Sequence, residues 1–281
     1  MAQSHSQLVQ TSFARPRFEI IPMKGVEEQL AHLPSDAVVT VTSSPTKGID
    51  ATLALAALLR RRDQRQVVPH VAARSVADTG HLKDLLQQLS DLGIDDVFAV
   101  AGDAEAPAGQ FESTLDLLRA MADLGHSLRI GITGYPESHA FIPDDTTIAV
   151  MHAKEPYASY IVSQICFDPQ VTAEWIAAVR ARGTRLPIHI GLPGAVDLAR
   201  LVRISMRVGI GDSLRFVRKQ GGTVARLIGG YQPDALVDGL LPTLADPAMG
   251  VAGWHLFTFN EIRRSEAWRR DLLARYARSE T

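Results

Sequence analysis

Eight short apolar runs, separated by segments with helical spacing, constrain the fold of this 281-residue chain more than any other feature. The runs are rich in β-branched residues, and most are apolar almost throughout, which is typical of parallel strands buried on both faces. They cover residues 17–22, 37–44, 67–74, 96–102, 128–135, 160–167, 186–194 and 254–260. Eight such strands alternating with helices predict an α/β fold, a single (β/α)8 TIM barrel.

The segments between the runs place Leu and Ala three and four residues apart, as amphipathic helices do. We expect helices at residues 49–62, 79–92, 113–124, 171–182, 195–206, 212–220 and 261–278. The long stretch between the seventh and eighth strands is expected to hold two or three extra helices. An open doubly wound sheet is the main competing fold, but no G-x-G-x-x-G turn follows the first strand. The runs also show no hairpin signal, so a closed barrel is favoured.

The chain is expected to form one domain. Its length would fit one or two domains, but no Gly/Ser-rich or Pro-rich linker interrupts residues 13–281, which we expect to be the catalytic barrel. Residues 1–12 are polar and are expected to be a flexible tail. The last helix carries Trp268 and Leu272 on one face, which predicts packing on the barrel or on a second subunit. A monomer or a small homo-oligomer is therefore expected.

The composition excludes several classes of protein. The chain has 29 Lys and Arg against 31 Asp and Glu, a net charge of −2, whereas nucleic-acid binders usually carry a strongly basic face. Its one cysteine excludes an intramolecular disulfide and a multi-cysteine metal cluster. The histidines lack metal-ligand spacing. No signal peptide is evident, and no apolar run approaches the roughly 20 residues of a membrane span. We expect a cytoplasmic protein without metal, nucleic-acid or membrane partners.

Polar residues near the ends of the strands are the candidates for function, because barrel enzymes build their sites there. Glu19 lies between Phe18 and Ile20, where a carboxylate is costly unless it is paired or functional. We give equal weight to two explanations of Glu19: a structural carboxylate paired with a basic residue lower in the barrel, and a functional group. Asp103 follows the fourth run and Gln164 lies in the sixth. Taken alone, each is more simply structural, a turn aspartate and a hydrogen-bonded core amide.

Other polar or reactive positions also have structural explanations. The Gly-Ile-Gly-Asp-Ser turn at 209–213 follows the seventh run, where barrels often bind phosphate, but a tight turn with a helix cap explains it equally well. His70, taken alone, is most simply a hydrogen-bonded core histidine, and Cys166 a small buried hydrophobe.

Several short motifs, taken in chain order, resemble those of the methylenetetrahydrofolate reductase family. The matching segments are 18–22 (FEIIP, family FEFFPP), 39–44 (VTVTSS, SVTYG), 69–70 (PH, the strand-three histidine), 101–103 (AGD, LRGD), 135–139 (YPESH, YPEVH), 163–168 (SQICFD, TQFFFD) and 257–260 (FTFN, FYTLN). YPESH is the most specific of them. The matches span nearly the whole chain in family order.

This resemblance implies a (β/α)8 catalytic domain that reduces 5,10-methylenetetrahydrofolate to 5-methyltetrahydrofolate, a step of one-carbon metabolism linked to methionine biosynthesis. It makes Glu19 the acid that protonates the folate toward N10, and the apolar flanks of this residue would raise its pKa as that role requires. Asp103 would face the pterin and stabilise the developing cation. Gln164 would hydrogen-bond the pterin or the nicotinamide amide.

The resemblance also implies a nucleotide site, lined here by Thr42, His70, Gly102, Tyr135, His139 and Lys154. Family members usually carry a flavin that passes the hydride from nicotinamide to folate. Here the arginine of LRGD is Ala101, the tyrosine of SVTYG is Ser43, and the basic stretch after the fifth strand keeps only Lys154. A flavin diphosphate needs charge-assisted donors. We therefore expect NADH or NADPH to reduce the folate directly, with bound FAD as the alternative.

Two other functions stay open. A lyase acting on a phosphorylated or carboxylated small molecule would use the 209–213 turn as an anion site and Lys47 or Lys154 as a catalytic amine. A folate-binding or nucleotide-binding module without turnover would keep the pocket but not the chemistry.

Overall fold

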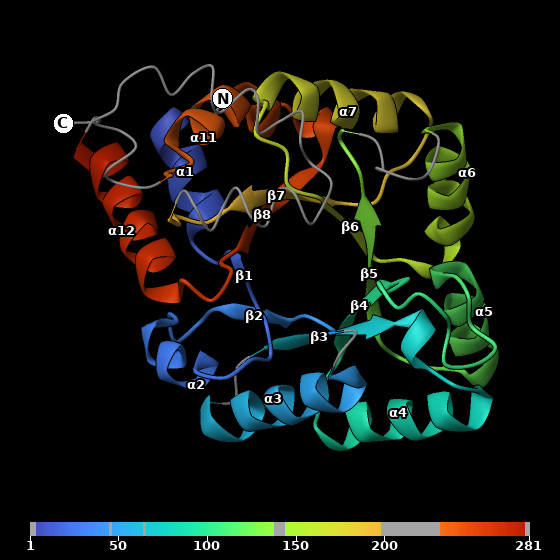
Figure 1. Cartoon of the computed structure of the whole chain (residues 1–281). Coiled ribbons are helices and arrows are strands. Elements are labelled where there is room, and N and C mark those ends of the chain that lie inside the picture. The colour runs from blue at the N-terminus through green and yellow to red at the C-terminus, as the bar shows by residue number, and fades with distance from the viewer. Residues whose placement is uncertain (1–3, 45–46, 64–65, 138–143, 198–230, 279–281) are drawn as a thin grey trace.

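Eight parallel strands close into one barrel, with β8 paired to β1 (Figure 1). The computed structural model describes residues 4–44, 47–63, 66–137, 144–197 and 231–278. The strands are β1 (Arg17–Ile20), β2 (Val38–Val41), β3 (Val67–Ala72), β4 (Asp96–Val100), β5 (Arg129–Gly134), β6 (Tyr160–Ser163), β7 (Ile188–Pro193) and β8 (Val251–Phe257). Each lies within or overlaps a predicted run, so the (β/α)8 TIM barrel prediction is confirmed.

Helices surround the sheet (Figure 1). They are α1 (His5–Phe13), α2 (Val26–Gln29), α3 (Gly48–Asp63), α4 (Thr79–Asp91), α5 (Thr114–Leu124), α6 (Asp144–Lys154), α7 (Pro169–Ala181), α11 (Asp234–Ala245) and α12 (Ile262–Arg278). Short 3-10 turns are η1 (Leu30–His32), η2 (Ala73–Ser75), η3 (Glu155–Tyr157) and η4 (Pro247–Met249).

After β7, the structure describes one extra helix and leaves most of the two predicted ones outside the described residues. Helix α11 is an extra helix between β7 and β8, as expected. The predicted helix at 212–220 and most of the one at 195–206 lie outside the described residues. Of the latter, Val196 forms an isolated bridge with Tyr231 and is not helical. Helix α6 was not predicted, because its sequence lacks a clear apolar face.

The amino-terminal segment corrects the prediction of a flexible tail over residues 1–12. Ser4 caps α1 in a capping box, and Leu8, Val9 and Phe13 are buried. The ring of Phe13 stacks on Trp254 of β8 at 5.1 Å and meets Trp268 of α12 edge-on at 5.6 Å. Residues 5–13 therefore belong to the folded domain, and α12 packs on its own chain through Trp268.

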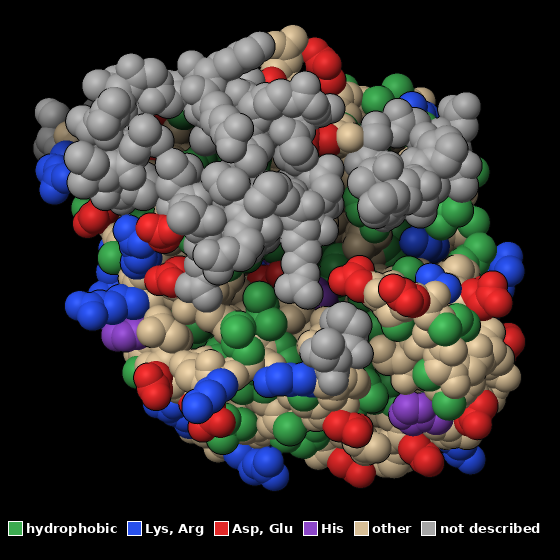
Figure 2. Space-filling model, viewed as in Figure 1, with side chains coloured by type: hydrophobic (Ala, Val, Ile, Leu, Met, Phe, Trp, Pro, Cys, Tyr) green, Lys and Arg blue, Asp and Glu red, His purple; other side chains and the backbone are tan. Residues whose placement is uncertain are grey.

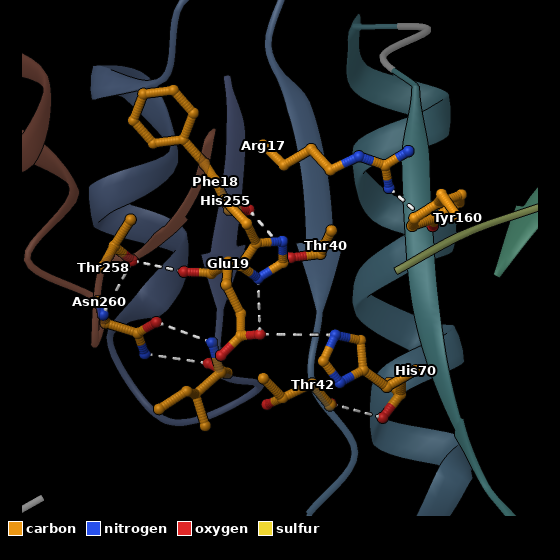
Figure 3. Close-up of polar contacts among 12 residues, drawn as sticks. Arg17, Phe18, Glu19, Thr40, Thr42, His70, Tyr160, His255, Thr258 and Asn260 are labelled. Atoms are coloured by element: carbon orange, nitrogen blue, oxygen red, sulfur yellow. Dashed lines mark hydrogen bonds and ion pairs between the residues drawn. The ribbon is translucent and has the colours of Figure 1, made fainter. Parts of the chain in front are cut away.

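The strands alternate between two buried faces. In β1, Phe18 and Ile20 are fully buried in the main core with residues of the surrounding helices. The side chains of Arg17 and Glu19 instead enter the barrel interior (Figure 3). The apolar flanks thus anchor the strand and leave two ionisable side chains inside the barrel.

A closed ionic network occupies the amino-terminal part of the interior. The guanidinium of Arg17 donates to Asp96 Oδ2 at 2.9 Å and to the Tyr160 hydroxyl at 2.8 Å, and that hydroxyl donates to Asp96 Oδ1 at 2.8 Å. A Cβ at Gly131 would lie 2.3 Å from the Tyr160 ring, so glycine is required there. This network satisfies both charges with direct partners, as a buried ion pair requires.

Acidic and basic side chains intermingle over the described part of the face in Figure 2. In the described part of the chain, no helix is both long and apolar enough to span a bilayer.

Candidate active site

Glu19 lies inside the barrel near the seam between its first and last strands. In the strand register, Glu19 is paired with Thr40 of β2 on one side and with Phe257 of β8 on the other. The side chain is 13% exposed and points toward two imidazole rings (Figure 3). The Glu19 carboxyl group is thus largely shielded from solvent, close to the mouth of the barrel.

Two histidines from different strands approach the same oxygen of this carboxyl. His255 Nε2 of β8 is 3.0 Å from Glu19 Oε2, a hydrogen bond, and His70 Nε2 of β3 is 3.6 Å from it. The two side chains are 1% and 8% exposed. The His70 ring packs on Phe98 at 4.8 Å.

The electrostatics keep this cluster largely neutral. Burial raises the pKa of Glu19 to about 7, against a smaller lowering by His70. Burial lowers the pKa of His70 to about 4 and that of His255 to about 3, the latter with help from the Arg17 charge. A carboxyl that is partly protonated at neutral pH, beside neutral imidazoles, is suited to donate a proton.

The basic groups that contact Glu19 in the described residues are two imidazoles, those of His70 and His255. Arg17, the basic residue lower on the same strand, extends away from Glu19 toward Tyr160 (Figure 3). Its guanidinium is bound by Asp96. Glu19 therefore has no arginine or lysine partner in the described residues, and of the two explanations for its burial the structure favours the functional one.

The backbone around Glu19 is clamped by the segment after β8. Thr258 Oγ1 donates to the Glu19 carbonyl at 2.6 Å, and Asn260 binds both the N–H and the C=O of Ile21, at 2.8 and 3.0 Å. Phe259 and Asn260 adopt φ values of 51° and 64°, a strained conformation outside glycine. The strain is retained where the clamp fixes the end of β1.

Asp103 and Tyr135 are brought together at the mouth, after β4 and β5. Asp103 is exposed, and its charge helps burial raise the pKa of Tyr135, whose hydroxyl is bonded to Thr133. Gly102 has φ 93°, and a Cβ there would lie 3.0 Å from Ala72 Cβ. The turn after β4 thus needs glycine, and that need explains Gly102 without a ligand.

Gln164 and Thr42 both directly follow strands on the same edge. The Gln164 carboxamide oxygen accepts from the Ile165 N–H at 2.9 Å. Thr42 is half-buried, and its N–H donates to the Ile20 carbonyl.

Other predicted residues are not brought to this site. Lys154 ends α6, which returns from the carboxyl end of β5 to the amino end of β6, so it lies at the opposite end of the barrel. Its burial lowers its pKa to about 8. This position corrects the predicted cofactor contact. His139 and the 209–213 turn lie outside the described residues. Cys166 is buried, as expected.

Two residues at the site were not predicted. The alternation of side chains along β8 could have identified His255. It lies two residues before Phe257 and opposite Arg17 in the strand register, so its side chain enters the barrel interior. Arg74 follows β3, and its N–H donates to the Ala101 carbonyl at 3.0 Å. Its Nε is buried without a partner in the described residues, and its Nη2 makes only a 3.5 Å bond to the Glu105 carbonyl. No sequence pattern pointed to it.

No group of three or more His, Cys, Asp and Glu side chains that could hold a metal ion occurs among the described residues.

Comparison with known families and curated proteins gives a consistent result. The family model for methylenetetrahydrofolate reductase matches residues 8–219. Methylenetetrahydrofolate reductase 2 of Saccharomyces cerevisiae is 26% identical over 134 residues, 43% of this chain and 22% of that protein. Methylenetetrahydrofolate reductase 1 of Schizosaccharomyces pombe is 29% identical over 118 residues, 38% and 19% respectively. The alignments thus span about a fifth of each yeast protein.

Solved structures share the barrel at low sequence identity. A Clostridium thermocellum protein, described as binding two copies of 5-methyl-5,6,7,8-tetrahydrofolic acid, superposes with a TM-score of 0.65 at 12% identity, over 95% of this chain and 99% of its own. Oxaloacetate acetylhydrolase superposes with a TM-score of 0.52 at 9% identity, over 97% and 85%. At these identities the likeness concerns the fold.

Proposed function

Because this chain belongs to the methylenetetrahydrofolate reductase family, we propose that it reduces 5,10-methylenetetrahydrofolate to 5-methyltetrahydrofolate with NADH or NADPH. The observation that carries the proposal is the Glu19 carboxyl, buried, free of any cationic side chain in the described residues, and with its pKa raised to about 7. The fold shared with a protein described as binding 5-methyltetrahydrofolic acid supports a reduced folate as the ligand.

The reaction begins with a proton transfer. Glu19, in its protonated form, donates its proton toward N10 of the imidazolidine ring, the C–N10 bond breaks, and a 5-iminium cation forms. Hydride from the dihydronicotinamide then adds to the exocyclic carbon, giving the methyl group and the oxidised nucleotide. The carboxylate left on Glu19 regains a proton from solvent, so one hydride and one proton are consumed in each turnover.

Two residues at the mouth complete the folate site. The Asp103 carboxylate is exposed there and would stabilise the positive charge that develops on the pterin. The NH2 group of Gln164, whose carboxamide oxygen is held by the Ile165 N–H, would donate a hydrogen bond to a pterin or nicotinamide oxygen.

The described residues do not reproduce the family's grip on a flavin, which would otherwise relay the hydride. Ala101 and Ser43 provide no charged or aromatic group, and Lys154 lies at the other end of the barrel. The proposed hydride path therefore runs directly from nicotinamide to folate. Arg74, whose backbone N–H binds the Ala101 carbonyl and whose buried Nε has no partner among the described residues, would bind the diphosphate of the nucleotide.

A lyase gains little support from the same geometry. Lys154 is far from the mouth, and Lys47 is exposed on the segment after β2. The barrel that this chain shares with oxaloacetate acetylhydrolase carries no information on chemistry.

The proposal is tested by following NADH and NADPH oxidation with methylenetetrahydrofolate, with and without added FAD, after recording the absorbance spectrum of the purified protein. We expect turnover without FAD and no flavin absorbance. Stoichiometric flavin in the purified protein would refute direct transfer, and folate binding without turnover would favour a binding module.

The Arg74→Gln variant tests the nucleotide contact. We expect about a tenfold rise in KM for NADH with little change in kcat, because a charge-assisted hydrogen bond is lost. Arg119→Gln, on α5, is the control.

A further inference from the structure

We propose that His255 is a positioning residue that donates its Nε2–H to Glu19 Oε2 and so keeps the acidic proton of Glu19 on the other oxygen, Oε1. The inference rests on the proposed role of Glu19 as the acid. It assigns His255 a role that acts through Glu19.

The first argument is that the two histidines meet Glu19 at one oxygen. His255 Nε2 is 3.0 Å from Oε2, and His70 Nε2 approaches the same atom at 3.6 Å. Only the first distance is that of a hydrogen bond. An oxygen that accepts a hydrogen bond in a carboxylic acid is the carbonyl oxygen, so the proton belongs on its partner.

The second argument concerns the tautomer of His255. A neutral imidazole carries one N–H, and the hydrogen bond made by one nitrogen determines which nitrogen holds it. His255 Nδ1 is buried without a hydrogen-bond partner in the described residues. A proton on Nδ1 would leave an unpaired buried donor, whereas a proton on Nε2 points at Glu19. The geometry therefore favours the Nε2–H tautomer.

The third argument is that the ring is buried and packed against two aromatic rings. It is 1% exposed, lies 4.8 Å from the Phe257 ring and 6.4 Å from the Phe98 ring, and belongs to a strand paired on both sides. Burial and the Arg17 charge lower its pKa to about 3, so it stays neutral and is not itself the acid. His255 can thus orient the proton of Glu19, but it cannot act as the acid in place of Glu19.

Two variants that differ in reach test the positioning. The carboxamide nitrogen of His255→Gln can lie near the position of the imidazole Nε2, whereas that of His255→Asn falls short of it. We expect the glutamine variant to keep kcat within a few fold and the asparagine variant to lose about 10²-fold, the usual cost of a misplaced reacting group. Equal losses in both would overturn the proposal, because a purely structural role does not depend on the donor's reach.

The pH profile separates orientation from packing. The reaction needs protonated Glu19, so kcat/KM falls as pH rises through its pKa. Losing a donor to the carboxylate raises that pKa, and the fall moves to higher pH in His255→Asn but not in His255→Gln. The titratable and charged groups that the described residues place around Glu19 and His255 are unchanged in both variants: His70 on β3, Arg17 on β1 and His189 on β7. A profile identical to the wild type in the asparagine variant would contradict the proposal.

Nitrogen NMR of the ¹⁵N-histidine-labelled protein tests the tautomer without any turnover. The chain has 9 histidines, and the signals of His255 are those lost in His255→Gln. We expect protonated Nε2 and bare Nδ1 at neutral pH, whereas a protonated Nδ1 would overturn the proposal. If the wild type does not reduce the folate, the proposed function fails, and this measurement alone decides whether His255 fixes the proton of Glu19.

Discussion

Two polar clusters lie one above the other inside the barrel, and they are built in opposite ways. In the lower cluster Arg17, Asp96 and Tyr160 bind one another through three hydrogen bonds of 2.8–2.9 Å. In the upper cluster one carboxyl, Glu19, meets two neutral imidazoles and has no cation beside it.

The difference is the one expected between a structural cluster and the acid that we propose. A buried network with every group paired specifies one arrangement of its side chains. A buried acid that lacks a counter-charge keeps its proton to higher pH, at a cost to stability. The two clusters lie next to each other along β1, since Arg17 and Glu19 are separated by a single residue and point to the same face of the strand.

The Glu19→Gln variant gives the largest expected effect. Removing the acid should lower kcat/KM by about 10²–10⁴-fold, the contribution of general acid catalysis. Thermal stability should stay equal or rise, because a buried ionisable group is lost. Glu27→Gln on exposed α2 is the control. A Glu19→Gln protein with wild-type turnover would remove this residue as the acid.

The Asp96→Asn variant should act in the reverse way. It leaves the Arg17 charge buried without a counter-ion, which costs about 3–5 kcal/mol of unfolding free energy. Urea denaturation measures the loss, and the double variant Arg17→Met/Asp96→Leu should recover much of it. Unchanged stability in Asp96→Asn would mean that the lower cluster is not the structural one.

Stability should depend on pH through Glu19. Burial raises its pKa from the ordinary value of 4.5, which applies in the unfolded chain, to about 7 in the folded protein. Between these values the folded state holds a proton that the unfolded state has released, so the unfolding free energy falls as pH rises from 4.5 to 7. The loss is about 3 kcal/mol. Denaturation of wild type and Glu19→Gln across this window isolates it, and parallel curves would contradict the raised pKa.

The Tyr160→Phe variant gives the smallest expected effect. It removes the hydroxyl that bridges Arg17 and Asp96 and should cost about 1–2 kcal/mol, since the direct ion pair survives. Turnover should be unaffected. A large fall in kcat here would show that the two clusters are coupled.

The sequence alone predicts the barrel because strand and helix periodicities are local. Every strand overlaps its predicted run, whereas the helix at 5–13 was expected to be a flexible tail. That helix is stable through Phe13, which stacks on Trp254 far along the chain. Such a contact leaves no local pattern.

The candidate site was predictable to the extent that it resembles known motifs. Glu19 was singled out as a carboxylate in an apolar strand, but its partner could not be chosen between a basic residue and a function. The choice depends on Asp96, which binds Arg17 from another strand. His255 was missed for a similar reason, because only the register of β8 against β1 places it beside the carboxyl.

The pairing of Glu19 with His255 joins residues 236 positions apart, across the seam where the first strand meets the last. A nascent chain that has not yet added β8 carries the acid but has nothing to orient it. We expect a loop of that length to close late in folding, because the chain loses conformational entropy before the contact between the two strands can form. The proposed reductase activity would therefore report ring closure, and during refolding it should return no earlier than the last strand joins the first.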